Sequence, residues 1–236
     1  MIDAALDKSG MVAHARRSRR GALSGPLLLP EDGRPPREII LFLHGLASNG
    51  DFLHALGPRL QACFPRALIA APNAPMGFPG VDNAYQWWRF EGLGPRSLAA
   101  GVKDAAPTLQ RYIDALLAAS GLSEERLVLA GFSQGAMLAV HAAITRPRTV
   151  AGVVAYSGML AHRALPWRAF GRKPPILLVH GGADAIIQPA AHEDAAARLS
   201  GYGCAVQPHL RRELGHAVDR VGFATGVRFI RQVLHG

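Results

Sequence analysis

The sequence predicts one α/β domain built on a mostly parallel, doubly wound sheet with helices on both faces. Apolar runs and stretches with helical spacing alternate along the chain, and within the runs the apolar residues do not alternate with polar ones. The 236 residues, 49% of them hydrophobic, are also enough for one large core. No repeat and no linker marks a second domain, so we expect a single domain over residues 25–236.

The predicted strands and helices follow from this alternation. The apolar runs bounded by turns, which we interpret as buried strands, span residues 38–45, 66–73, 126–133, 149–158 and 174–182. The stretches with helical spacing span residues 52–63, 97–119, 134–146, 189–200 and 218–234. Pro147 ends the third helix, and Pro107 inside the second predicts a kink or two shorter helices.

Residues 1–24 contain a cluster of arginines and no long apolar segment, so we expect a flexible basic tail and no signal peptide. The arginines are Arg16, Arg17, Arg19 and Arg20. A contact of this tail with acidic lipid or nucleic acid is the alternative. The net charge of +9 does not favour a nucleic-acid partner, because the other basic residues are scattered and no aromatic residues interleave with them.

Other composition signals exclude further classes of protein. The sequence has no window of about twenty uninterrupted apolar residues, so we expect no stable membrane insertion. Cys63 and Cys204 are far apart and lack metal-ligand spacing, so we expect no metal site and no disulfide framework, although a pairing of the two stays open. This usage of cysteine favours a reducing, cytoplasmic compartment.

The pentapeptide Gly131-Phe-Ser-Gln-Gly135 predicts a nucleophile at Ser133. It matches G-x-S-x-G and lies where a buried strand gives way to a helix, a turn that exposes the serine hydroxyl above the helix amino terminus. Glycines flank the serine because side chains there would collide with the strand and the helix. The alternative is a glycine-rich turn with the serine as a helix cap.

Asp184 and His216 are the candidate partners of Ser133. A serine hydroxyl needs a base to take its proton, and the base is usually a histidine oriented by a carboxylate. Asp184 follows a strand and His216 precedes the last helix, which gives the chain order Ser, Asp, His of the α/β-hydrolase fold. Either residue could instead cap a helix. His44 and His180, which precede glycines at strand ends, are interpreted as residues that order loops.

An oxyanion hole is predicted from two main-chain N–H groups. The turn at His44-Gly45 lets the N–H of Leu46 face the site beside that of Gln134.

Five segments together resemble the phospholipase/carboxylesterase family, which includes acyl-protein thioesterases and small bacterial carboxylesterases. They are "FLHGLASNG", "APNAP", "GFSQGAMLA", "VHGGADAIIQP" and "LGHAV". The resemblance covers about residues 25–235. It implies an α/β-hydrolase without a large cap domain that cleaves esters or thioesters through an acyl-serine and needs no cofactor.

Carried onto this chain, the resemblance makes Ser133 the nucleophile, His216 the base and acid, and Asp184 its orienting partner. It also implies a substrate-side aromatic residue where Trp87 and Trp88 stand, although core packing is the alternative. Further candidates to line an acyl pocket are Met76, Phe78 and Met159. The chain departs from the family pattern L-G-[DE] at Leu46-Ala47-Ser48, which bears on substrate choice.

The leading functional prediction is a serine carboxylesterase for short- to medium-chain acyl esters. A lysophospholipase or an acyl-protein thioesterase is the alternative within the same class. A binding module that kept the fold and lost the chemistry is the alternative from another class. The expected partner is a small acyl ester or thioester, and a homodimer stays open.

Overall fold

The structure is a computed structural model and describes residues 13–14, 23–162 and 172–236. Within these residues the main sheet has eight strands in the order β1-β2-β4-β3-β7-β8-β9-β10. They are β1 (Ala13–His14), β2 (Pro26–Leu28), β3 (Glu38–Leu43), β4 (Ala67–Ala70), β7 (Leu127–Phe132), β8 (Gly152–Tyr156), β9 (Ile176–Gly181) and β10 (Val206–Arg211). The six strands from β4 to β10 in this order are parallel, whereas β1 and β2 are antiparallel additions at one edge. The predicted mostly parallel sheet is confirmed.

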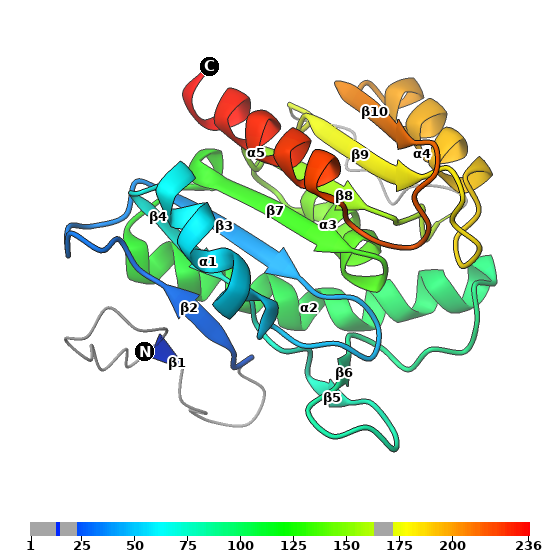
Figure 1. Cartoon of the computed structure of the whole chain (residues 1–236), viewed down its shortest axis with the longest axis horizontal. Coiled ribbons are helices and arrows are strands. Elements are labelled where there is room, and N and C mark those ends of the chain that lie inside the picture. The colour runs from blue at the N-terminus through cyan, green and yellow to red at the C-terminus, as the bar shows by residue number, and fades with distance from the viewer. Residues whose placement is uncertain (1–12, 15–22, 163–171) are drawn as a thin grey trace.

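Helices cover both faces of the sheet, as predicted (Figure 1). They are α1 (Phe52–Cys63), α2 (Pro95–Ser120), α3 (Gln134–Thr145), α4 (Ala190–Gly201) and α5 (Arg220–His235). Helices α1 and α5 bury residues such as Leu60 and Phe229 against one face, and α2, α3 and α4 bury residues such as Ile113 and Leu138 against the other. No large cap covers the sheet in the described part of the chain.

Helix α2 runs through Pro107 as one element of 26 residues, so the expectation of two shorter helices is wrong. A proline inside a helix removes one hydrogen bond and costs about 3 kcal/mol. Apolar side chains on both sides of Pro107 offset this cost, because Leu98 and Val102 before it and Leu109 and Ile113 after it are all buried. The kink itself stays a prediction.

The short strands were not predicted. Strands β5 (Met76–Gly77) and β6 (Tyr85–Gln86) form a two-stranded antiparallel pair beside the loop that follows β3. The N–H of Tyr85 donates to the carbonyl of Ser48 at 2.8 Å, which ties this pair to that loop. Strands of two or three residues carry no period that a sequence could display.

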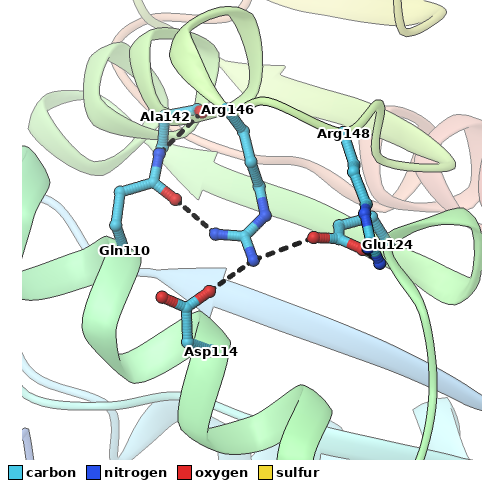
Figure 2. Close-up of polar contacts among 6 residues, drawn as sticks. All are labelled: Gln110, Asp114, Glu124, Ala142, Arg146 and Arg148. Carbon is cyan, nitrogen blue, oxygen red and sulfur yellow. Dashed lines mark hydrogen bonds and ion pairs between the residues drawn. The ribbon is translucent and has the colours of Figure 1, made fainter.

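An ion-pair network fixes α2 and α3 at the end of α3 away from Ser133 (Figure 2). The Arg146 guanidinium, only 6% exposed, donates to Gln110 Oε1 and pairs with the carboxylates of Asp114 and Glu124. Glu124 lies in the 3-10 turn that leads into β7. Arg146 therefore joins both helices to the start of the central strand.

Four further points of the sequence analysis concern the cysteines, a membrane span, a metal site and the basic tail. Cys63 and Cys204 are free thiols, so they are not paired. No helix among the described residues is long and apolar enough to span a bilayer, and these residues hold no cluster of three or more metal-ligating side chains. The arginines of the predicted basic tail lie outside the described residues.

Candidate active site

Ser133 lies in a strained turn between β7 and α3. Its φ of 51° and ψ of −116° lie in a region that non-glycine residues rarely occupy. The turn is tight because strand and helix touch: a Cβ on Gly131 would lie 2.4 Å from the carbonyl oxygen of Gly135. The Ser133 N–H donates to the carbonyl of Tyr156, at the end of β8, at 2.9 Å. The hydroxyl is thus held at the carboxyl edge of the sheet, where ligands bind in folds of this type.

The side chains of Asp184 and His216 are hydrogen-bonded to each other. Asp184 Oδ2 accepts from His216 Nδ1 at 2.8 Å, and Oδ1 accepts from the N–H groups of Ile186 and Ile187, both at 2.9 Å. Burial raises the pKa of Asp184, but the hydrogen bonds from His216 and the two N–H groups lower it by more. The carboxylate therefore stays ionised and fixes the His216 tautomer with its proton on Nδ1, which leaves Nε2 as a base.

The loops that carry Asp184 and His216 lie in direct contact. A Cβ on Gly181 would lie 2.2 Å from the carbonyl oxygen of Leu214, and the N–H of Ala183 donates to that same oxygen at 2.9 Å. The glycine that ends β9 is required because a side chain there would push the two loops apart.

The far end of the His216 loop is closed by a salt bridge. Arg211, the last residue of β10, donates from Nη2 to Asp219 Oδ2 at 2.8 Å, and Asp219 Oδ1 caps α5 by accepting from the N–H of Gly222. The loop is therefore anchored at both ends, on β10 and on α5.

The structure brings the elbow, which is the turn of residues 131–135 that carries Ser133, and the His216 imidazole side by side. The ring of Phe132, the residue before Ser133, lies 4.9 Å from the His216 imidazole, centroid to centroid. Among the described residues the Ser133 hydroxyl makes no hydrogen bond, and such contacts are often long before substrate binds. Ser133, Asp184 and His216 follow β7, β9 and β10, so all three lie at one edge of the sheet.

The two predicted oxyanion donors belong to segments that pack against each other. Gln134 is the first residue of α3, so its N–H has no partner inside the helix. A Cβ on Gly135 would lie 2.2 Å from the carbonyl oxygen of Leu43 and 2.5 Å from that of His44, so the chain leading to Leu46 rests on this first turn.

His44 and His180 order loops, and this prediction is confirmed. His44 bonds through Nδ1 to the carbonyl of Gly45 at 2.7 Å and accepts at Nε2 from the N–H of Ala74 at 2.9 Å. Burial lowers the pKa of His44 to about 4, so its imidazole is neutral. His180 bonds through Nε2 to the carbonyl of Ile187 at 2.8 Å.

The five predicted substrate contacts lie in different surroundings. They are Met76, Phe78, Trp87, Trp88 and Met159. Trp87 and Trp88 are 2% and 4% exposed and belong to the core, whereas Met76 is exposed and Phe78 is half-buried. Met159 lines a small cavity between α3 and α4. Acyl contact by these side chains stays a prediction.

Sequence reasoning missed a role for the Gln134 side chain, which is buried and bonded to the backbone of two residues. Its Oε1 accepts from the N–H of Trp87 at 2.9 Å, and its Nε2 donates to the carbonyl of Trp88 at 3.0 Å. The glutamine inside G-F-S-Q-G was the available signal, because a buried amide must find partners.

The model of the phospholipase/carboxylesterase family matches residues 29–234. The chain belongs to this family. It is similar to the Escherichia coli K12 esterase YpfH, with 29% identity over 188 residues that cover 79% of this chain and 78% of that protein. A rice protein described as a probable inactive carboxylesterase is 26% identical over 220 residues, 87% of this chain and 89% of its own length.

Solved structures agree with this assignment. The crystal structure of esterase PE8 matches with a TM-score of 0.82 and 31% identity, over 90% of this chain and 100% of that one. Arabidopsis thaliana SOBER1, at 22% identity, has a TM-score of 0.68 over 84% of this chain and 99% of its own, which supports the fold alone. The protein has the α/β-hydrolase fold and is a carboxylic ester hydrolase.

Proposed function

We propose that this hydrolase cleaves short- to medium-chain acyl esters through an acyl-serine intermediate, with Ser133, His216 and Asp184 as its triad. The observation that carries the proposal is the 2.8 Å bond from His216 to a buried carboxylate, beside a serine held in a strained turn. This arrangement supplies nucleophile, base and orienting group at one edge of the sheet.

In the first step His216 Nε2 takes the Ser133 proton while Oγ attacks the acyl carbon. The carbonyl π electrons move onto oxygen, and the N–H groups of Leu46 and Gln134 stabilise the anion. When the intermediate collapses, the bond to the alcohol breaks and His216 returns the proton to the leaving oxygen. Water then attacks the acyl-serine by the same steps and releases the acid.

Ser133→Ala tests the assignment. We expect kcat for p-nitrophenyl butyrate to fall by about 10⁴-fold or more, with an unchanged melting temperature, because only the nucleophile is removed. Ser157→Ala is the matched control: Ser157 directly follows the neighbouring strand β8, has a φ of 47°, and has a buried hydroxyl without a hydrogen-bond partner in the described part of the chain. Ser133→Ala turnover near the level of that control would refute the assignment.

A fluorophosphonate probe separates this enzyme from a binding module. The rice relative is described as a probable inactive carboxylesterase, so that alternative has a precedent among the relatives of this chain. The probe phosphonylates an activated serine, and we expect labelling of the wild-type protein that Ser133→Ala abolishes. Folded wild-type protein that stays unlabelled would favour the binding module.

Substrate class is tested by rates across p-nitrophenyl esters of increasing chain length, with a thioester and a lysophospholipid alongside. We expect kcat/KM to be highest for acyl chains of about two to eight carbons. A maximum at longer chains with good lysophospholipid turnover would favour a lysophospholipase, and a preference for the thioester would favour a thioesterase.

We also propose that the enzyme works in the cytoplasm without a cofactor or a nucleic-acid partner. A homodimer is tested by light scattering of the purified chain.

A further inference from the structure

We propose that Trp87 is a positioning residue for the oxyanion hole, and that Gln134 acts on both halves of that hole: its own N–H is one donor, and its side chain, through Trp87 and His44, orients the other. The inference rests on the proposed function. It concerns how the site is held and adds no group that touches substrate.

The first link joins the elbow to the chain that follows β6. The Gln134 amide bonds to the Trp87 N–H and to the Trp88 carbonyl, at 2.9 and 3.0 Å. Gln134 is 3% exposed, so water does not compete for these bonds. The two bonds hold the backbone at Trp87 directly against the first residue of α3.

The second link joins Trp87 to the loop after β3. The indole Nε1–H donates to the carbonyl of His44 at 2.9 Å, and the two rings lie 5.4 Å apart, centroid to centroid. His44 is 3% exposed and is also fixed from its far side by the N–H of Ala74. Both the carbonyl and the ring of His44 are therefore held.

The third link sets the direction of the Leu46 N–H, the second donor of the oxyanion hole. With its proton on Nδ1, as the bond from Ala74 to Nε2 requires, His44 donates to the carbonyl of Gly45 at 2.7 Å. That carbonyl and the Leu46 N–H belong to the same peptide unit, which is planar and trans, so they point in opposite directions. Fixing the carbonyl fixes the direction in which the Leu46 N–H points.

The neighbouring tryptophan provides the contrast. Trp88 is as buried as Trp87, and its ring packs against α2 at Gly101, yet its Nε1–H has no hydrogen-bond partner among the residues that the structure describes. Both indoles bury an N–H, but only that of Trp87 is bonded to the loop that carries Leu46. The two adjacent residues therefore separate packing from positioning.

Trp87→Phe and Trp88→Phe form the test, with p-nitrophenyl butyrate as substrate and an alkyl trifluoromethyl ketone as mimic of the tetrahedral intermediate. Each variant replaces an indole by a phenyl ring, but only Trp87→Phe loses a hydrogen bond to the loop after β3 that carries Leu46. Since loss of a whole oxyanion donor costs about 10²–10³ in kcat, we expect Trp87→Phe to lower kcat by about 10- to 100-fold with little change in KM. Ketone affinity should fall by the same factor as kcat/KM.

Trp88→Phe measures the effect of replacing an indole by a phenyl ring without loss of a hydrogen bond that the structure describes, and its ketone affinity should fall much less. Equal losses in the two variants, or a Trp87→Phe change confined to KM, would overturn the inference. If Trp87→Phe does not fold, Gln134→Met replaces it, since it removes the bonds to the backbone of Trp87 and Trp88 without adding a charge beside the oxyanion, and the same split between kcat and KM is expected. Wild-type protein without serine labelling would instead refute the proposed function, so the two failures are distinguishable.

Discussion

Replacing Gly135 by alanine tests whether the loop after β3 is held against the elbow. The added Cβ would lie 2.2 Å from the carbonyl oxygen of Leu43 and 2.5 Å from that of His44. Both contacts are with backbone, so no side chain can rotate out of the way. Ordinary van der Waals contact begins near 3.4 Å, so α3 and this loop must separate by about 1 Å.

The size of the effect follows from what the loop carries. Leu43 ends strand β3, which is buried along its whole length and resists movement. The displacement therefore falls on the loop that leads to Leu46 or on the first turn of α3. A misplacement of about 1 Å in catalytic geometry can cost about 10²-fold, and loss of an oxyanion donor about 10²–10³. We therefore expect kcat to fall by about 10²-fold. Overpacking should also lower the free energy of unfolding by about 1–3 kcal/mol.

Steady-state hydrolysis of p-nitrophenyl butyrate and urea unfolding measure the two effects. Gly201→Ala is the matched control, because Gly201 ends helix α4 and a Cβ there would meet nothing within 4 Å. Gly135→Ala protein that is folded at the assay temperature and keeps kcat within threefold of wild type would show that the packing of this loop does not set the oxyanion geometry.

Two further predictions concern stability. Burial lowers the pKa values of His44, His141 and His192 from 6.5 to about 4, so between these pH values the unfolded chain binds about three more protons than the folded one. The free energy of unfolding should therefore fall as pH drops through this window, by up to about 4 kcal/mol per pH unit, and urea unfolding at pH 7 and 5 that gave equal values would contradict this. Arg146→Met should lower the free energy of unfolding by about 3 kcal/mol, because it leaves buried Glu124 with only the exposed Arg148, at 3.7 Å. Arg148→Met, which removes that exposed side chain, should lower it by less than about 1 kcal/mol. Equal losses in urea unfolding would contradict the buried network drawn in Figure 2.

The long elements were predictable because burial leaves a periodic record. The helix predicted over residues 52–63 has these same bounds, and β7 lies within the run predicted over residues 126–133. The edge strands β1 and β2 were missed, since two or three residues carry no period and an antiparallel addition depends on a partner far along the chain.

The candidate active site, like the fold, could be predicted from the sequence only in part. Strand ends and the chain order of Ser133, Asp184 and His216 can be read from local pattern, because the carboxyl ends of parallel strands share one edge. The different surroundings of Trp87 and Trp88 cannot be read in this way, since the two are identical neighbours in sequence and only the indole N–H of Trp87 meets a carbonyl among the described residues. That partner, on His44, lies 43 residues away.

Close backbone approach recurs at this edge, and it explains why glycines occupy these positions. The backbones of loops that follow different strands can touch only where a side chain is absent. Gly135 allows the loop after β3 to pack against α3. Gly181 allows the loop that carries Asp184 to pack against the loop that carries His216. Substitution at either glycine should therefore act through the positions of the reacting groups and lower kcat, whereas changes at exposed Met76 leave these contacts intact and should alter KM or substrate choice.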